Sequence, residues 1–318
     1  MLQMILPEGS SSLLAFFGIL FAFGATVLAT AKLSPYLPKD AGREFAHDGK
    51  LSAGKPRGAG IIFVMAFVAS VLLFSPLSAE LVIYLLLIVV CMMTGFLDDA
   101  SKTPWGEYKK GFLDLCVAAL VAITFLKYNS NAVELVHVKF TLPPVVFAIL
   151  TVILVWTSVN VTNCSDGVDG LSGTLSIITI MSIYIVDRMK DVNETYSFLI
   201  LLFAVCILGY LWYNATPSKL MMGDAGSRAM GFISIAILKS GCPFLFIPLA
   251  LVLILDGGLG LLKVSLLRFL KIHILKNVRT PLHDHVRKVW DWSNTQTVFR
   301  FAIIQIILSL AVIYAMQL

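Results

Sequence analysis

Five aspartates in glycine-containing polar segments are the groups in this chain best suited to chemistry. Asp98 and Asp99 are adjacent at the end of an apolar run, Asp224 directly follows a glycine, and Asp166 and Asp169 lie three residues apart. Carboxylates that converge without a counter-charge repel one another and raise each other's pKa values, which a bound cation relieves. Ligands that are all oxygen favour a hard divalent ion, Mg²⁺ or alternatively Mn²⁺, over zinc. Because Mg²⁺ completes its coordination with phosphate oxygens, the aspartates predict phosphate or diphosphate chemistry.

Each of these aspartates also has a structural interpretation. The pair Asp98-Asp99 could be a solvated helix end, although acids at a helix C-terminus oppose the macrodipole. Asp224 could cap the start of a helix. Asp166 and Asp169 could form turns with their own backbone. Convergence of all five at one site is what would favour the chemical interpretation.

Two further acids occur within apolar runs. Asp256 is followed by two glycines. It is either functional, as acids at membrane depth usually are, or it satisfies backbone groups freed by a helix break. Asp114 lies one turn into an apolar run and either faces the same cavity as the other aspartates or extends to the interface. The sequence leaves these alternatives open.

Basic residues and histidines near the aspartates are suited to phosphate oxygens. Lys50 and Lys55 lie in or beside a glycine-rich segment, and His283 and His285 lie in a basic loop. We expect His283 to contact phosphate, because two histidines two positions apart more often bind phosphate or backbone than a metal. The chain has neither an H-E-x-x-H motif nor a nucleophile elbow. Metal-assisted phosphoryl transfer is therefore favoured over hydrolysis of a peptide or glycoside.

The composition requires a membrane to hold these residues in place. Of 318 residues, 58% are hydrophobic and only 14% are charged, and the mean hydropathy is +0.89. Soluble globular chains carry about a quarter charged residues, so a cytosolic enzyme, a disordered chain and a disulfide scaffold are excluded. Five cysteines without paired spacing predict neither disulfides nor a zinc site. The net charge of +5 indicates membrane topology, and no nucleic-acid partner is expected.

Ten apolar stretches predict an all-α integral membrane protein that forms a single domain over residues 1–318. They cover residues 12–33, 58–75, 81–97, 111–126, 143–159, 171–186, 197–213, 225–239, 243–263 and 299–317. Most fall near the lower end of the roughly 17–25 residues that a spanning helix needs. The eighth is the weakest, because polar residues crowd its start. Continuous rather than alternating apolar character excludes a β-barrel.

The positions of lysine and arginine predict the orientation. With the N-terminus outside, most of the 24 basic residues fall in cytoplasmic turns and helix ends, as the positive-inside rule requires. Both termini are then extracellular. Five polar segments, one in each cytoplasmic turn, come out on the same face: residues 54–60, 95–99, 160–170, 222–227 and 281–285. We therefore expect one active-site groove on the cytoplasmic face.

The last four of these segments resemble, in order and on the same face, those of the polyprenyl-phosphate N-acetylhexosamine-1-phosphate transferases. The resemblance covers nearly the whole chain. It is strongest to the branch that transfers phospho-MurNAc-pentapeptide from UDP-MurNAc-pentapeptide to undecaprenyl phosphate, which makes lipid I and UMP for peptidoglycan. It implies a multi-pass protein of the bacterial plasma membrane, with its active site facing the cytoplasm. It also implies Mg²⁺ dependence and a homodimer.

The resemblance further implies roles for individual residues. Asp98 would be the base that deprotonates the lipid phosphate, and Asp224 and Asp99 would bind Mg²⁺. His283 matches the first residue of a three-histidine motif and completes the catalytic set. The other implied contacts are to the nucleotide and phosphates, and they come from Lys50 or Lys55, Asn160, Asn163, Asp166, Asp169, Gly223 and His285.

Three departures from the family pattern bear on the substrate. Asp284 replaces the middle histidine, the first loop lacks the usual threonine-rich turn, and Met221-Met222 replace the aromatic residue that would stack on uracil. The alternative donor, with the same chemistry, is UDP-GlcNAc. A remote alternative is an ion-coupled transporter, which needs polar residues at the bilayer midplane and access from both sides. One-step transfer and a phospho-aspartate intermediate both remain open.

Overall fold

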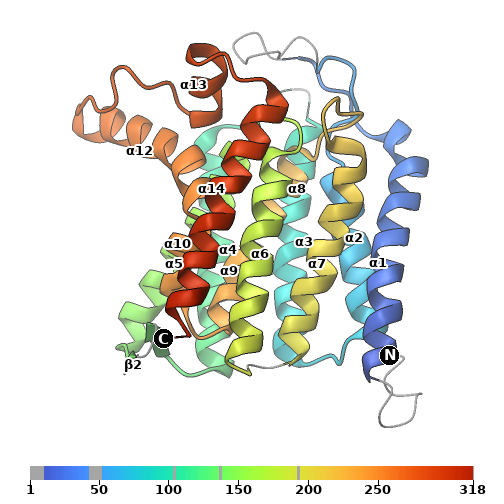
Figure 1. Ribbon diagram of the computed structural model, residues 1–318, viewed down its shortest axis with the longest axis vertical. Coiled ribbons are helices and arrows are strands. Elements are labelled where there is room, and N and C mark those ends of the chain that lie inside the picture. Colours follow the sequence, from blue (N-terminus) through green and yellow to red (C-terminus); the bar gives the residue numbers. More distant parts are fainter. Residues whose placement is uncertain are drawn as a thin grey trace.

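Long apolar helices form a bundle in which successive helices run in opposite directions (Figure 1). The computed structural model describes residues 11–42, 52–101, 103, 105–135, 138–191 and 194–317. Helices suit these apolar runs because all backbone polar groups are then paired within the segment, as lipid requires. The long helices are α1 (Ser11–Leu33), α3 (Ala79–Asp99), α4 (Glu107–Tyr128), α5 (Pro144–Ser165), α6 (Leu171–Met189), α7 (Glu194–Asn214) and α14 (Asn294–Ala315).

Shorter helical pieces complete the bundle. The short 3₁₀ turn η2 (Ser34–Tyr36) directly follows α1, and the next helix is α2 (Gly60–Phe74). Helix α8 (Gly223–Ala229) is separated from α9 (Phe232–Lys239) by two residues. The ninth apolar stretch is broken into pieces and bends by 71° between residues 243–249 and 251–270. Its pieces are η3 (Pro243–Leu245), α10 (Phe246–Leu249), α11 (Leu251–Leu253), η4 (Ile254–Gly258), α12 (Leu259–Ser265) and η5 (Leu266–Leu270). In Figure 1, α12 extends away from the bundle, close to α13 (Leu282–Val289).

One hairpin was absent from the all-α prediction. Strands β1 (Ala132–Leu135) and β2 (Val138–Thr141) pair antiparallel, with Val133 opposite Phe140. The hairpin lies between α4 and α5, at the end of the bundle opposite α13 (Figure 1). Glu134 donates its backbone N–H to the carbonyl oxygen of Gly241 at 2.9 Å, which ties the hairpin to the turn after α9.

The ten predicted membrane crossings are confirmed only in part. Each of the ten apolar stretches contains helix, but seven described helices are long and apolar enough to span, or eight if the bent pair is one span. The helix α2 has only fifteen residues, and α8 and α9 are shorter still. Large apolar side chains remain exposed on α1, α5 and α14, as a lipid-facing surface requires.

Close backbone contact between glycines draws α2, α3 and α8 together. A Cβ atom at Gly60 would overlap the backbone nitrogen of Gly226, and one at Gly95 would overlap the carbonyl group of Asp224. Aromatic packing supports the same region, since Phe67 and Phe203 have ring centroids 4.9 Å apart. The ends of α2, α3 and α8 that carry polar residues are thereby held against one another.

The five polar segments of the sequence lie at one end of the bundle, called the polar end below. Helix α3 ends there with Asp99, and Arg57 donates its backbone N–H to the carbonyl of Pro38, just beyond α1. The start of α1 and the end of α14 both lie at the opposite end, on opposite sides of the bundle (Figure 1). This arrangement fits an even number of crossings.

Candidate active site

Hydrogen bonds and close contacts join all five polar segments, so their predicted convergence is confirmed. Backbone N–H groups of residues 59 and 60 donate to the carbonyls of residues 221 and 222, each at 3.0 Å. The Ala225 N–H donates to Asp99 Oδ2 at 3.2 Å. Asn163 Nδ2 donates to Ser227 Oγ at 2.8 Å. A Cβ at Gly167 would overlap the ring of His283.

Asp99 is enclosed by Arg57 and by the turn that begins α8. Arg57 Nε lies 2.8 Å from Asp99 Oδ1, while the same guanidinium contacts Asp224 Oδ1 and Asp40 Oδ1, each at 3.4 Å. The Asp99 side chain is 0% exposed. Gly223 has φ +66°, and a Cβ there would overlap Asp99 Oδ2, so glycine is required at this position. Burial lowers the pKa of Arg57, but Asp99, Asp224 and Asp40 outweigh it and raise that pKa.

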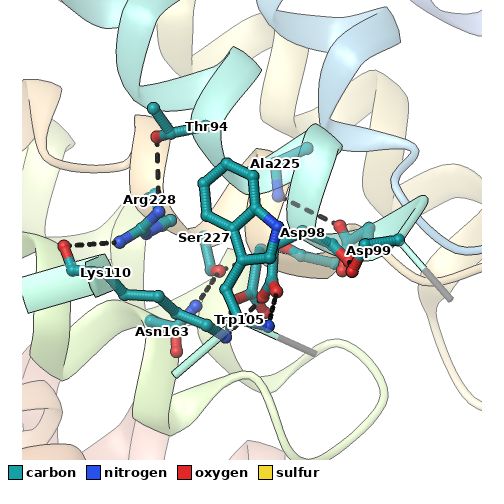
Figure 2. Close-up of polar contacts among 12 residues, drawn as sticks. Thr94, Asp98, Asp99, Trp105, Lys110, Asn163, Ala225, Ser227 and Arg228 are labelled. Carbon is teal, nitrogen blue, oxygen red and sulfur yellow. Dashed lines mark hydrogen bonds and ion pairs between the residues drawn. The ribbon is translucent and has the colours of Figure 1, made fainter. Parts of the chain in front are cut away.

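Lys110 lies between Asp98 and Asp224. Its Nζ atom forms an ion pair with Asp98 Oδ2 and lies 3.0 Å from Asp224 Oδ2. The other oxygen of Asp98 accepts the backbone N–H of Trp105 at 2.6 Å (Figure 2). The Asp98 and Asp224 side chains are 4% and 12% exposed. Asp224 is therefore the carboxylate of the three that solvent or a ligand reaches most readily.

The two cations overturn one premise of the sequence argument. The expectation that the aspartates converge without a counter-charge is wrong. Two cations, Arg57 and Lys110, form ion pairs with them. Burial raises the pKa of Asp224, but Lys110 and Arg57 outweigh that effect and hold this pKa below its ordinary value. Asp224 thus remains ionised without a bound metal, and the case for Mg²⁺ depends on the donor set.

The donor set fits a hard metal ion whose coordination a substrate completes. The described residues contain no group of three His, Cys, Asp or Glu placed to hold a metal by themselves. Asp224 nevertheless shares a cationic side chain with each neighbouring aspartate, Arg57 with Asp99 and Lys110 with Asp98, so carboxylate oxygens converge around it. Mg²⁺ typically uses only one or two protein carboxylates together with substrate phosphates. The arrangement therefore suits Mg²⁺ with a diphosphate and does not resemble a closed protein cage.

The segment after α5 lies beside the same aspartates. Asp166 caps α5 and raises the pKa of Arg57 through its charge. Asp169 Oδ2 accepts the backbone N–H of Ser218 at 3.2 Å and lies 3.8 Å from Lys55 Nζ, which also donates to Ser218 Oγ at 3.0 Å. Asn160 Nδ2 donates to the carbonyl one turn earlier, at Trp156. Lys50 lies outside the described residues.

His283 is held by Asp256. His283 Nδ1 lies 2.9 Å from Asp256 Oδ2, and the His283 backbone N–H donates to Asp256 Oδ1 at 2.7 Å. Asp256 lies in η4, a π-helical segment within the broken ninth stretch, so the acid is at a helix break and also contacts a predicted site residue. His285 accepts the Arg279 N–H at 3.3 Å and packs on Trp290. These contacts of His285 lie within its own loop.

Two site residues carried little weight in the sequence argument. Arg57 lies in the predicted polar segment 54–60 but had no assigned role, and Lys110 was only one of the basic residues that predict the orientation of the chain. The polar segment beside Arg57 was the available signal for it, whereas Lys110 sits in a run of two lysines that any cytoplasmic helix end could carry. Asp114 neither faces the cavity nor extends to the interface, because it pairs with buried Arg228 at 2.8 Å.

Comparisons with known proteins show which family this chain belongs to. A model of glycosyl transferase family 4 matches residues 81–241, half of the chain. The phospho-N-acetylmuramoyl-pentapeptide-transferase of Treponema pallidum (strain Nichols) is 40% identical to this chain. The match covers 93% of this chain and 86% of that protein. The chain belongs to this transferase family. The protein of the same name from Clostridium acetobutylicum is 26% identical, and the match covers 92% of this chain and 96% of that protein. The one from Bartonella quintana is 27% identical, and the match covers 94% of this chain and 90% of that protein.

The family match includes part of the site and confirms the predicted resemblance. Asp98, Asp99, Asn163 and Asp224 fall within residues 81–241. Arg57 and His283 fall outside that range. The structure places Arg57 against Asp99 and His283 against the turn at Gly167. The family is a transferase family, which leaves the ion-coupled transporter without support.

Proposed function

We propose that this enzyme transfers phospho-MurNAc-pentapeptide from UDP-MurNAc-pentapeptide to undecaprenyl phosphate, which yields lipid I and UMP for peptidoglycan synthesis. The observation that carries the proposal is the 40% identity to the Treponema pallidum transferase over 93% of the chain. Arg57 and Lys110 supply the cationic donors that phosphate oxygens bind, and the carboxylates beside them supply oxygens for a hard metal ion.

The proposal places the chain in the bacterial plasma membrane. Ten crossings, with both termini outside, would put the polar end in the cytoplasm, where the nucleotide substrate is made available. The distribution of lysine and arginine supports this orientation. Undecaprenyl phosphate would reach the polar end laterally from the lipid. A homodimer is part of the same proposal, and it follows from the family resemblance alone.

In the proposed reaction, a phosphate oxygen of undecaprenyl phosphate attacks the β-phosphorus of the UDP-sugar. The bond between the β-phosphorus and the bridging oxygen breaks, and UMP leaves. Asp98 accepts the proton of the lipid phosphate, if that phosphate arrives protonated. Lys110, held between Asp98 and Asp224, and Arg57 are placed to stabilise phosphate charge.

The remaining contacts orient the substrate. His283 presents Nδ1 to Asp256, which leaves Nε2 directed at the Gly167 turn. As an imidazolium, His283 would donate the Nε2–H to a phosphate oxygen. Asn160, Asn163, Asp166, Asp169 and Lys55 would position the nucleotide and its phosphates. Asp224, with Asp99, would hold Mg²⁺, and the bound ion would neutralise the diphosphate and the charge that develops on UMP. Gly223 allows the close approach of this turn to Asp99.

The experiment that tests the function compares two sugar donors. Purified protein in detergent is supplied with undecaprenyl phosphate, Mg²⁺ and either UDP-MurNAc-pentapeptide or UDP-GlcNAc, and UMP release is measured. Release with the first donor alone supports the proposal. Release with UDP-GlcNAc alone would keep the chemistry and reject the substrate, and no release with either donor from folded protein would reject the function.

A further inference from the structure

A second polar layer lies directly beneath the carboxylates. Arg228 Nη2 donates to Asp114 Oδ2 at 2.8 Å and to the backbone carbonyl of Lys110 at 3.2 Å. Its Nη1 atom donates to Thr94 Oγ1 at 3.3 Å. Figure 2 shows the guanidinium between Thr94 and Lys110. One side chain therefore contacts both α3 and α4 from its own position on α8.

The two layers share the same helices at the same spacing. Thr94 lies four residues before Asp98 on α3, Asp114 lies four residues after Lys110 on α4, and Arg228 lies four residues after Asp224 on α8. Residues four apart occupy the same face of a helix, about one turn from each other. Each helix thus offers one residue to the upper layer of Asp98, Lys110 and Asp224, and one to the lower layer.

The lower layer is sealed from solvent. The Arg228 and Asp114 side chains are 2% and 3% exposed, whereas Lys110 and Asp224 above them are 27% and 12% exposed. Substrate therefore has no route to Arg228 comparable to its route to Lys110. The planar guanidinium directs several N–H groups at fixed angles, which lets it bond a hydroxyl, a carbonyl and a carboxylate together.

Net stability is a poor explanation for such a pair. A buried ion pair loses the hydration of both charges, and its replacement by apolar residues of similar size is often neutral or stabilising. The bond to the Lys110 carbonyl offers a different explanation. It fixes the first turn of α4 relative to α8, and this is the turn that determines where Lys110 Nζ lies between the two aspartates.

We infer that Arg228 and Asp114 are positioning residues that set the register of α3, α4 and α8 and so place Lys110 between Asp98 and Asp224. Neither residue touches the reacting atoms. Their effect on turnover rests on the proposed function, since it assumes that Lys110 acts on the transferred phosphate. Their effect on the geometry of α4 does not depend on that function.

The test replaces the buried pair with apolar side chains in the full-length protein, as Asp114→Val with Arg228→Met. We expect the UMP release rate constant kcat to fall about a hundredfold, as small misplacements of reacting groups do, while KM for the UDP-sugar and the melting temperature in detergent change little. Arg228→Lys keeps a charge beside Asp114 but lacks the planar fork. We expect an intermediate kcat for it.

A matched control is the buried pair at the opposite end of the bundle. Lys239 Nζ lies 3.1 Å from Glu80 Oε2, and their side chains are 9% and 11% exposed. Glu80→Leu with Lys239→Met removes a comparable ion pair far from the site and should leave kcat unchanged. Hydrogen–deuterium exchange of residues 105–116 gives a readout that needs no activity, and we expect faster exchange only in the Asp114/Arg228 variant.

The outcomes separate the positioning role from the proposed function. Unchanged exchange and unchanged kcat in the Asp114/Arg228 variant would overturn the inference. So would an equal loss of kcat in both double variants that follows their melting temperatures, because that pattern indicates stability alone. If wild-type protein releases no UMP, the function fails, and the exchange of residues 105–116 still decides whether Arg228 fixes α4.

Discussion

The carboxylate of Asp256 contacts two groups of His283, the imidazole ring and the backbone N–H. Asp256 Oδ1 accepts the His283 N–H at 2.7 Å while Oδ2 lies 2.9 Å from Nδ1. Both side chains are buried. A carboxylate on Nδ1 fixes the orientation and tautomer of a histidine, so that Nε2 faces away from the acid. Here Nε2 faces the turn at Gly167, beside the segment assigned to phosphate binding.

Removal of the negative charge on Asp256 is expected to impair His283 without removing it. Asp256→Asn should lower kcat about 10- to 100-fold, as loss of an orienting partner does elsewhere, with the chain still folded. UMP release and a melting curve in detergent measure the two effects. The control is Glu107→Gln, which disrupts the exposed pair with Arg268 at the same end of the bundle. Equal kcat values for Asp256→Asn and wild type would contradict the assigned orientation.

Asp224 is expected to be indispensable because it is the most exposed of the three clustered carboxylates. Asp224→Asn should lower kcat by about three orders of magnitude, since a ligand and a charge are lost together. Removal of divalent ions with EDTA should abolish UMP release from the wild type, and Mg²⁺ should restore it. Calcium should restore it poorly, because Ca²⁺ prefers more ligands at longer distances. Full activity in EDTA would reject the metal assignment.

Lys110 is expected to control the acid limb of the pH–rate profile. Burial favours the protonated form of Asp224, and Lys110 with Arg57 reverses this and holds the pKa of Asp224 below 3.8. Lys110→Met removes the largest of the effects that lower the pKa of Asp224, so that pKa rises. Loss of kcat/KM on acidification should then begin at a higher pH than in the wild type. An acid limb at the same pH in both proteins would show that Asp224 does not govern it.

Close glycine packing is expected to be essential where α2 meets α8. Gly60→Ala would force a methyl group into the backbone of Gly226, and overpacking of this kind costs about 1–3 kcal/mol or more of stability. Gly111→Ala in α4 is the matched control, because nothing lies within 4 Å of the added Cβ. A helical alanine there should stabilise the protein slightly. Equal melting temperatures for the two variants would contradict the close approach.

The sequence predicted the helices and their shared polar end because each rests on a strong local signal. Continuous apolar runs require helices in lipid, and basic residues report the side of the membrane. The helix break at Asp256 was also foreseen as one of two alternatives, since two glycines follow the acid. Fewer than ten described helices are long and apolar enough to span a membrane, because α2, α8 and α9 are too short.

Side-chain pairings between distant segments could not be predicted from the sequence. Nothing local to Lys110 distinguishes it from Lys109, yet only Lys110 reaches Asp98 and Asp224, while Lys109 lies over the ring of Trp105. Asp114 had two interpretations, and its partner Arg228 lies 114 residues away. The convergence of aspartates was predicted correctly, but their neutralisation by Arg57 and Lys110 depends on packing that a linear pattern does not encode.

The most direct test of the central claim follows the β-phosphorus of the donor. UDP-MurNAc-pentapeptide labelled with ³²P at the β-position is incubated with the protein, undecaprenyl phosphate and Mg²⁺, and the products are separated into lipid and aqueous phases. The proposed reaction predicts that the label moves into the lipid phase in equal amount with the unlabelled UMP released. Label that appears instead in inorganic phosphate or in a water-soluble sugar phosphate would contradict transfer to the lipid.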